Sequence, residues 1–182
     1  MRISVLLGSP RKNGNTKRLI NEFLKHFEGS SVDIIDSYSV NVSGCRGCDA
    51  CKDTGVCVFN DDMCEIIKKL KKADMIVLAF PLYFDAMPAP MKMIIDRMQP
   101  LYNLTYGAGK RPEINKKGIA LITAGSKAVR DYSLDNTCKY FLNLLGASFE
   151  GAFVVDRTDI DEGSDKFLNA AKAAVERVLS NR

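Results

Sequence analysis

The alternation of short apolar segments with helical patterns is the feature of this sequence that most constrains its fold. Five apolar segments have the length of strands, and they occupy residues 3–7, 32–36, 75–80, 118–123 and 149–155. Between them and after the last one, apolar residues recur at the three- and four-residue spacing of helices. This order predicts a single doubly wound α/β domain over residues 1–182, with a five-stranded parallel sheet and helices on both faces.

The third apolar segment indicates where a ligand would bind. Met75-Ile76-Val77-Leu78-Ala79-Phe80 is continuously apolar, which is typical of a central parallel strand covered on both faces. Ligands of such sheets bind outside the carboxyl ends of the strands, at the point where the strand order reverses. The loops after the first, third and fourth strands are therefore predicted to converge on one site.

Composition limits the classes of function. The 182 residues are 46% hydrophobic and 26% charged, as is typical of a globular protein with one buried core. The net charge of +4 is small and dispersed, which disfavours nucleic acid as a partner. No apolar run approaches the ~20 residues that span a bilayer, and the segment after Met1 has the character of a strand rather than a signal peptide. We therefore expect a cytoplasmic protein that does not bind membranes.

The loop after the first strand is rich in groups that bind anions. It reads Gly8-Ser9-Pro10-Arg11-Lys12-Asn13-Gly14-Asn15-Thr16, and a helical pattern begins at its end. At that point, unpaired backbone N–H groups and the positive end of the helix dipole attract a phosphate. Side-chain donors are added by Ser9, Arg11, Asn15 and Thr16. The spacing fits neither a dinucleotide-binding motif nor a P-loop, which leaves a capped βα turn as the alternative to a phosphate site.

The other two loops indicate the rest of the ligand. The loop at residues 81–88 contains Tyr83 and Phe84, whose rings are suited to flanking a flat ring system, and the loop at residues 124–126 is small. FMN, which has a terminal phosphate and a broad flat ring, would match all three loops. The alternative is that Tyr83 and Phe84 only cover the end of a strand.

Several motifs taken together resemble the flavodoxin-like NAD(P)H-dependent FMN reductases. They are the first loop described above, Cys45-Arg46-Gly47-Cys48-Asp49-Ala50-Cys51 with Gly55-Val56-Cys57, Asn60-Asp61-Asp62-Met63, Pro81-Leu82-Tyr83-Phe84 and Ile95-Asp96-Arg97. The resemblance is close over residues 2–97 and rests on pattern alone beyond them. It implies a flavodoxin-like fold, non-covalently bound FMN and a homodimer or homotetramer. It also implies hydride transfer from NADH or NADPH to a small acceptor such as a quinone, an azo or nitro compound, or free flavin.

The same resemblance assigns site residues. It implies that the first loop holds the phosphate of FMN and that the second lines its ribityl chain and ring, with a looser match in the third. The implied cofactor residues are Ser9, Arg11, Asn13, Asn15, Thr16, Pro81, Leu82, Tyr83, Phe84, Thr123 and Gly125. Hydride transfer depends on the stacking of two rings more than on a side-chain acid or base, so no catalytic residue is predicted.

Four cysteines lie within thirteen residues, in a polar loop at about residues 41–60 that we call the cysteine loop. Their pattern is Cys45-x2-Cys48-x2-Cys51-x5-Cys57. In a cytoplasmic protein this density indicates a metal or redox role rather than structural disulfides. Zinc fits only in part, because structural zinc sites usually use two separated C-x2-C pairs, whereas ferredoxin-like clusters use a run of this kind.

The cysteine motif also resembles that of the iron-sulfur flavoproteins, a branch of the same family. That resemblance implies a [4Fe-4S] cluster ligated by Cys45, Cys48, Cys51 and Cys57, and electron exchange with ferredoxin-like partners. Two other interpretations stay open: a loop that only packs at a subunit interface, and a reversible Cys48–Cys51 pair or zinc site. The FMN reductase is therefore the first prediction and the iron-sulfur flavoprotein its alternative. The remaining cysteines, Cys64 and Cys138, are at helical positions predicted to face the core.

Overall fold

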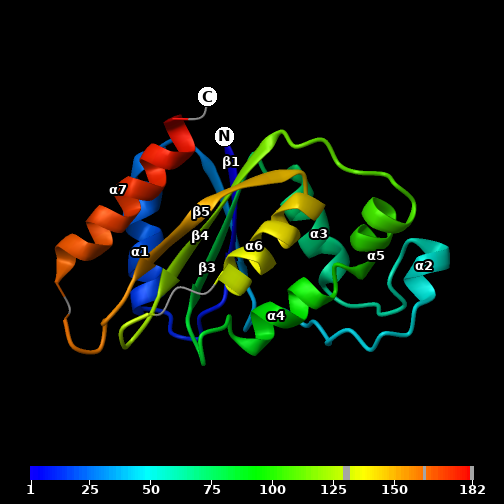
Figure 1. The fold of residues 1–182 in the computed structure, drawn as a ribbon, viewed down its shortest axis with the longest axis horizontal. Coiled ribbons are helices and arrows are strands. Elements are labelled where there is room, and N and C mark those ends of the chain that lie inside the picture. Colours follow the sequence, from blue (N-terminus) through cyan, green and yellow to red (C-terminus); the bar gives the residue numbers. More distant parts are fainter. Residues whose placement is uncertain (129–131, 162, 181–182) are drawn as a thin grey trace.

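The computed structural model describes residues 1–128, 132–161 and 163–180, and it contains the predicted five-stranded parallel sheet (Figure 1). The strands are β1 (Arg2–Leu7), β2 (Ser31–Asp36), β3 (Met75–Pro81), β4 (Lys116–Thr123) and β5 (Ala147–Val155). Their order in the sheet is β2-β1-β3-β4-β5, and each neighbouring pair is parallel. This is the strand order of flavodoxin-like folds, in which the switch point lies between β1 and β3. The predicted fold class is confirmed.

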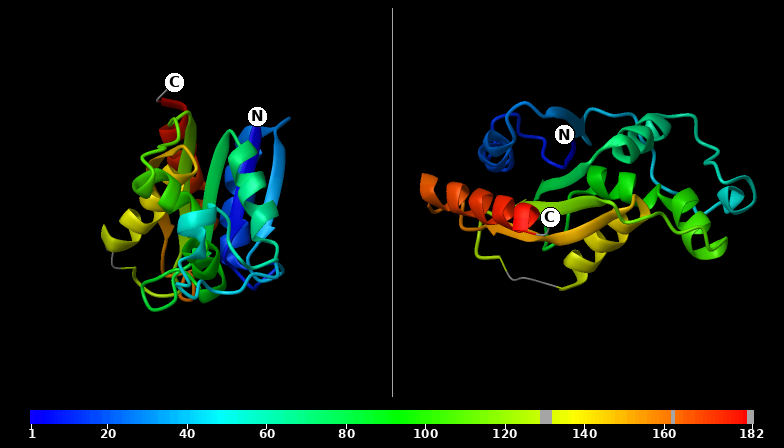
Figure 2. Two further views of the ribbon diagram at one scale, coloured as in Figure 1. Left: turned by 90° about the vertical axis from the view of Figure 1, so that its right-hand side faces the viewer. Right: turned by 90° about the horizontal axis from the view of Figure 1, so that it is seen from above.

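Helices cover both faces of the sheet. They are α1 (Asn15–Leu24), α2 (Ala50–Thr54), α3 (Met63–Lys72), α4 (Ala89–Asp96), α5 (Gln99–Tyr102), α6 (Tyr132–Leu144) and α7 (Ser164–Ser180), with the short 3-10 helix η1 (Lys25–Phe27) and the short π-helix η2 (Asn103–Gly107). Figure 2 shows α1 and α7 on one face and α3, α4 and α6 on the other, while α2 and α5 lie together at one end of the molecule. Among the described residues, no helix has both the length and the apolar character needed to cross a bilayer.

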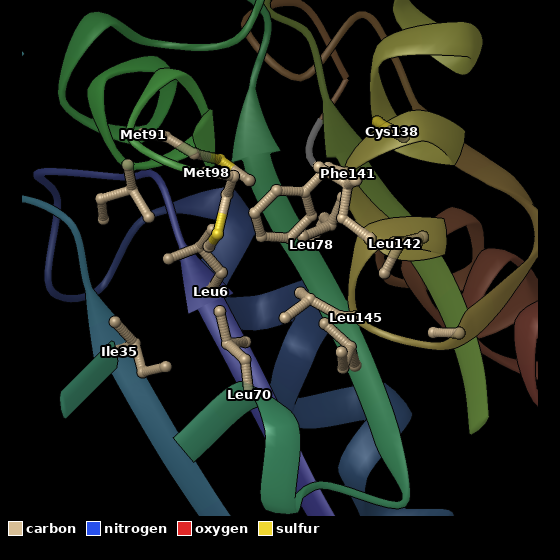
Figure 3. Packing of buried hydrophobic residues seen from close by; sticks show 14 of the residues in the cluster. Leu6, Ile35, Leu70, Leu78, Met91, Met98, Cys138, Phe141, Leu142 and Leu145 are labelled. Atoms are coloured by element: carbon tan, nitrogen blue, oxygen red, sulfur yellow. The ribbon is translucent and has the colours of Figure 1, made fainter. Parts of the chain in front are cut away.

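The sheet divides the core into two layers. Odd-numbered residues of β3 pack with α1 and α7, whereas its even-numbered residues pack with α3, α4 and α6, because successive side chains of a strand point to opposite faces. Figure 3 shows the second layer, in which Leu6 and Leu78 of the sheet face Phe141 and Leu145 of α6 and the loop after it. Burial on both faces is the reason that the sequence of β3 is continuously apolar.

Apolar residues recur at helical spacing from Met91 to Leu101, but the structure divides this stretch into two helices. α4 ends at Asp96, and α5 begins only at Gln99, with Pro100 in its first turn. Proline has no N–H with which to continue the hydrogen-bond ladder of a preceding helix, so the chain turns before it. This break directs Arg97 away from the sheet layer and toward the cysteine loop.

The prediction for the two helical cysteines is confirmed for Cys138 and wrong for Cys64. Cys138 in α6 is fully buried, and burial raises its pKa to about 12. Cys64 is exposed, because the buried face of α3 is formed by Met63, Ile66 and Leu70. One residue along an α-helix turns the side chain by about 100°, which carries Cys64 off that face.

Candidate functional site

A pocket of about 350 Å³, which we call the switch-point pocket, opens at the carboxyl edge of the sheet. The three predicted loops contribute to it, and a segment after β5 joins them. Its lining residues are Ser9, Arg11, Gly14, Asn15, Thr16, Pro81, Leu82, Tyr83, Thr123, Gly125, Ser126, Thr158 and Asp159. All the predicted cofactor residues except Asn13 and Phe84 are therefore brought together around one pocket.

The first loop presents the amino end of α1 to this pocket. Gly14 precedes the helix in an extended conformation (φ −82°, ψ 174°), and the first helical turn contains no acidic residue. The N–H groups of a first turn have no acceptor within their helix and carry the positive end of its dipole. A Cβ on Gly14 would lie 2.8 Å from the Cβ of Arg11, so glycine allows the loop to close tightly. The geometry of the loop is that of an anion site.

A buried pair of hydroxyls joins the first loop to the end of β4. Thr16 and Thr123 are 2% and 3% exposed, and their Oγ1 atoms lie 2.8 Å apart, a hydrogen bond in which either atom can be the donor. A hydroxyl has one proton to donate and two lone pairs. The hydroxyl that accepts this bond therefore keeps its own proton, and both residues line the pocket.

The second loop folds into a two-residue turn. Tyr83 and Ala86 exchange backbone hydrogen bonds of 2.9 and 3.1 Å, and Phe84 and Asp85 between them have φ values of +51° and +56°. Asn and Gly are the usual residues in such turns, because positive φ is costly for other residues. Phe84 is fully exposed at the tip of the turn, whereas Tyr83 lines the pocket. Asn13, the other predicted residue outside the lining, is exposed in the first loop.

The segment after β5, which supplies Thr158 and Asp159 to the pocket, is not among the site residues predicted from the sequence. The N–H groups of Thr158 and Asp159 donate to the carbonyls of Ala124 and Gly125 at 3.0 and 3.2 Å, which extends the β4–β5 pairing beyond the strands. A Cβ on Gly125 would collide with the Asp159 carboxylate, so glycine allows the two segments to approach. The available signal was a polar run, residues 156–159, directly after an apolar strand.

A second pocket of about 280 Å³, which we call the cysteine pocket, lies between the cysteine loop and the chain around α5. It is lined by Cys45, Arg46, Gly47, Cys48, Asp49, Cys51, Cys57, Val58, Phe59, Arg97, Gln99, Pro100 and Asn103. All four predicted metal ligands are among them. In the described part of the chain, no group of three or more His, Cys, Asp or Glu side chains is arranged to hold a metal ion. The structure thus gathers the four thiols around one pocket without placing them in coordinating positions.

Asn103, Arg46 and Arg97 line the cysteine pocket together with these thiols. The Asn103 Nδ2 atom lies 3.3 Å from Sγ of Cys51, and the guanidinium carbons of Arg46 and Arg97 lie 5.0 and 4.7 Å from the centroid of the Phe59 ring. Burial raises the pKa of Cys51, and the three other cysteines of the loop raise it further. Such donors suit a group that is ligated by thiolates, because hydrogen bonds to sulfur stabilise the negative charge there.

Arg97 and Asp61 form a buried ion pair beside the cysteine pocket. Their side chains are 1% and 8% exposed, and the Arg97 Nη1 and Nη2 atoms donate to the two carboxylate oxygens at 2.6 and 3.0 Å. Nη1 also donates to the carbonyl of Ser43 at 2.8 Å. Burial opposes the ionisation of both groups, yet their hydrogen bonds hold the pKa of Asp61 below its usual value and the pKa of Arg97 above it. The pair ties the segments on both sides of the four cysteines to the end of α4.

α4 connects the two pockets. It begins shortly after the second loop, which lines the switch-point pocket, and ends one residue before Arg97, which lines the cysteine pocket. Such a helix is about 12 Å long. Near its start, Met91 packs so closely on the first loop that a Cβ on Gly8 would lie 2.7 Å from the Met91 sulfur. The helix therefore packs against the first loop near its start and separates the two pockets.

The strand order and the two pockets define a flavodoxin-like α/β protein with a pocket at its switch point, where α1 begins, and a second pocket lined by cysteines. A family model described as NADPH-dependent FMN reductase matches residues 1–156. The chain therefore belongs to this family, as its motifs predict. The matched region contains the cysteine pocket and the three predicted loops.

Curated relatives include an iron-sulfur flavoprotein of Methanocaldococcus jannaschii, which is 41% identical over 103 residues that cover 56% of this chain and 53% of that protein. An iron-sulfur flavoprotein of Methanosarcina thermophila is 35% identical over 129 residues, covering 70% of this chain and 65% of that protein. The chain thus spans between half and two thirds of the length of these relatives. The predicted resemblance to the iron-sulfur flavoprotein branch is confirmed at the level of sequence.

Solved structures with the same fold include an NAD(P)H:quinone oxidoreductase from Methanothermobacter marburgensis, with a TM-score of 0.67 and 16% identity over 97% of this chain and 95% of that one. An FMN-dependent NADH-azoreductase from Bacillus anthracis, in complex with FMN, has a TM-score of 0.66 and 14% identity over 100% of this chain and 99% of that one. At these identities the similarity establishes the fold alone.

Proposed function

We propose that this protein is an FMN-dependent oxidoreductase that binds FMN in the switch-point pocket. The observation that carries the proposal is the convergence on one pocket of the loop that begins α1, the loop that contains Tyr83 and the small glycine-containing loop after β4. The lining combines hydroxyl, amide and guanidinium donors with Tyr83, which matches a ligand with a terminal phosphate and a flat ring. Membership of the FMN reductase family supports the same ligand.

In this proposal the chain binds and orients the cofactor. The N–H groups at the start of α1, the Ser9 hydroxyl and the Arg11 guanidinium hold the phosphate, and the free hydroxyl proton of the Thr16–Thr123 pair adds a further donor. When bound, FMN supplies an acceptor for a hydride from NADH or NADPH. Tyr83 and its loop would hold the flavin ring where a nicotinamide can stack on it. Hydride transfer between two stacked rings requires no side-chain acid or base.

We propose further that the cysteine pocket binds a [4Fe-4S] cluster, which would make the protein an iron-sulfur flavoprotein. Four thiols around one pocket are the donor set that such a cluster requires, and the Asn103 amide beside Cys51 adds an N–H donor to sulfur. The names of the relatives that are 41% and 35% identical support this assignment. A bound cluster supplies one-electron transfer, so the chain would link nicotinamide oxidation to a one-electron carrier such as ferredoxin.

A second candidate function is reduction of a small acceptor without a cluster. It is favoured by one observation, that the thiols within the described residues are not in coordinating positions. The acceptor would be a quinone, an azo or nitro compound, or free flavin, in line with the names of the quinone oxidoreductase and the azoreductase that share the fold. For either function we propose a cytoplasmic homodimer or homotetramer, and the six free thiols support that location.

Flavin titrations test the first proposal. The flavin-free protein should bind FMN more tightly than riboflavin, because only FMN carries the phosphate that the first loop would hold. Arg11→Gln removes a cation of the pocket lining, and it should weaken FMN binding on the order of 10-fold while changing riboflavin binding little. Lys12→Gln removes the neighbouring cation, which lies outside the lining, and is the matched control. Equal affinities for FMN and riboflavin, or equal losses in the two variants, would refute the assignment of the phosphate site.

Iron and acid-labile sulfide, measured in protein purified without oxygen, test the second proposal. About four irons per chain together with flavin absorption would support a [4Fe-4S] cluster. Cys48→Ala should then lose iron, whereas Cys64→Ala, an exposed thiol of α3 outside the pocket, should keep it. Flavin absorption without iron in the wild type would leave the small-acceptor function.

Steady-state assays distinguish the two candidate functions. Rapid oxidation of NADH or NADPH in the presence of a small quinone would favour direct reduction of a small acceptor. Turnover only in the presence of ferredoxin would favour the iron-sulfur flavoprotein. Comparing the two nicotinamides in the same assay also identifies the electron donor.

A further inference from the structure

Arg97 forms a buried cationic wall of the cysteine pocket. It is 1% exposed and lines the pocket together with the four cysteines of the loop. Asp61 and the carbonyl of Ser43 hold its guanidinium through three hydrogen bonds of 2.6 to 3.0 Å. The ring of Phe59 packs against the same group. A side chain with this many contacts has a defined orientation.

The Nε atom of this guanidinium has no hydrogen-bond partner in the described structure. Nη1 and Nη2 donate to Asp61 and Ser43, whereas Nε is buried and makes no hydrogen bond within the described structure. Buried N–H groups are nearly always paired, and an unpaired donor on a charged group is costly. A partner for Nε is therefore expected among the groups that the cysteine pocket holds.

Sulfur is the acceptor that the surroundings favour. Cys57 and Arg97 line the same pocket, and the pKa of Arg97 is raised, against the effect of burial, by its hydrogen bonds to Asp61 and by the charge of Cys57. The pocket lining contains four thiols and one carboxylate, that of Asp49, whose side chain is exposed and paired with Lys52. Thiolate sulfur is thus the anionic acceptor that the lining of the pocket offers to the Nε donor.

We propose that Arg97 is a positioning residue that donates a hydrogen bond from Nε to a sulfur atom of the cluster or of its Cys57 ligand. The inference rests on the proposed [4Fe-4S] site. Asp61 balances the charge of Arg97 and fixes its plane, so the sulfur receives an oriented N–H dipole rather than a mobile cation. Hydrogen bonds to the sulfur atoms favour the more negative, reduced form, so this contact raises the reduction potential.

Two variants separate this role from the structural role of the ion pair. The double variant Asp61→Leu with Arg97→Met replaces both charges by apolar side chains of similar size, a change that folds usually tolerate. Arg97→Lys keeps a charge but lacks the planar fork and its Nε donor. Lys92→Gln removes an exposed positive charge from α4, the helix that ends one residue before Arg97, and is the matched control.

Wild type and variants are reconstituted with iron and sulfide without oxygen, and iron content, midpoint potential and iron affinity in competition with a chelator are measured. We expect Lys92→Gln to match the wild type. Both Arg97 variants should show a more negative midpoint potential and bind iron on the order of 10 to 100 times less tightly, as happens when outer hydrogen-bond partners of metal ligands are removed.

Circular dichroism shows which variants are folded, and should the double variant not fold, Arg97→Lys decides alone. A folded Arg97 variant with the potential and iron affinity of Lys92→Gln overturns the proposal. A wild-type chain that takes up no iron refutes the cluster itself and overturns this inference with it, whereas normal uptake with unchanged variants overturns only the role of Arg97.

Discussion

Asp61→Asn should destabilise the fold strongly, because the carboxylate accepts four hydrogen bonds in a buried site. Oδ2 accepts from Arg97 Nη1 at 2.6 Å and from the N–H of Ser43 at 3.3 Å. Oδ1 accepts from Arg97 Nη2 at 3.0 Å and from the N–H of Met63 at 3.2 Å. The Asn amide has a single oxygen, so its NH2 group would face two of these donors. The buried charge of Arg97 would also lose its counter-ion.

Breaking a buried ion pair by removing one partner costs about 3–5 kcal/mol. In a chain of this size each 1 kcal/mol lowers the Tm by roughly 2–4 °C, so the Tm of Asp61→Asn should fall by roughly 6–20 °C. Urea unfolding followed by circular dichroism gives the free energy itself. The matched control is Asp96→Asn, which breaks a pair with Lys92 whose side chains are 48% and 46% exposed. Exposed pairs contribute about 0–1 kcal/mol, so losses in the two variants that agree within about 1 kcal/mol would refute the reasoning.

The lowered pKa of Asp61 predicts that the free energy of unfolding depends on pH. Burial raises the pKa of Asp61, but hydrogen bonds from Arg97 and from backbone N–H groups lower it by more, so the folded-state pKa lies below the unfolded one. The stabilisation is then complete above the unfolded pKa of about 3.9 and is lost as the pH falls through the folded-state pKa. The difference in unfolding free energy between wild type and Asp61→Asn should therefore be constant from about pH 7 to about pH 5 and shrink below about pH 4. A difference that grows in acid would contradict the direction of the shift.

Three further substitutions test the switch-point pocket. Gly8→Ala should lower the free energy of unfolding by about 1–3 kcal/mol and weaken FMN binding, because the Cβ of the alanine would lie 2.7 Å from the sulfur of Met91. An unchanged urea midpoint would show that α4 shifts freely to make room. Thr16→Val should cost about 1–3 kcal/mol in urea unfolding, since the buried Thr123 hydroxyl loses its partner at 2.8 Å, and should weaken FMN more than riboflavin. Phe84→Gly should stabilise by up to about 1 kcal/mol in thermal melts by relieving a positive φ, and a fall in FMN affinity in the same variant would establish Phe84 as part of the flavin site.

The sequence by itself determined the fold class and the position of the switch-point pocket. Continuous apolarity of residues 75–80 requires cover on both faces, and a parallel sheet brings the carboxyl ends of its strands to one edge. Those two facts are enough to bring Ser9, Tyr83 and Thr123 to one pocket from three distant loops. Repeating patterns report the positions of strands and helices, so the features that depend on strand order alone could be predicted.

The orientation of individual side chains could not be read from the same patterns. Cys64 is one residue away along the chain from Met63, which lies on the buried face of α3. Phe84 lies at the tip of a turn whose hydrogen bonds could not be predicted from the sequence. Thr158 and Asp159 reach the pocket because backbone pairing between β4 and β5 continues past the strands. Each of these outcomes depends on a local angle or hydrogen bond that hydrophobic periodicity does not encode.

The cysteine pocket and its ion pair were decided only by the tertiary structure. The motifs that contain Asp61 and Arg97 are visible in the sequence, and the four cysteines mark a site, but nothing in the motifs pairs the two charges. The pair joins residues 36 positions apart, one at the end of an irregular loop and one where α4 breaks before Pro100. A contact between two irregular segments cannot be predicted from a repeating sequence pattern. It arises from the packing of particular side chains once the sheet and helices have formed.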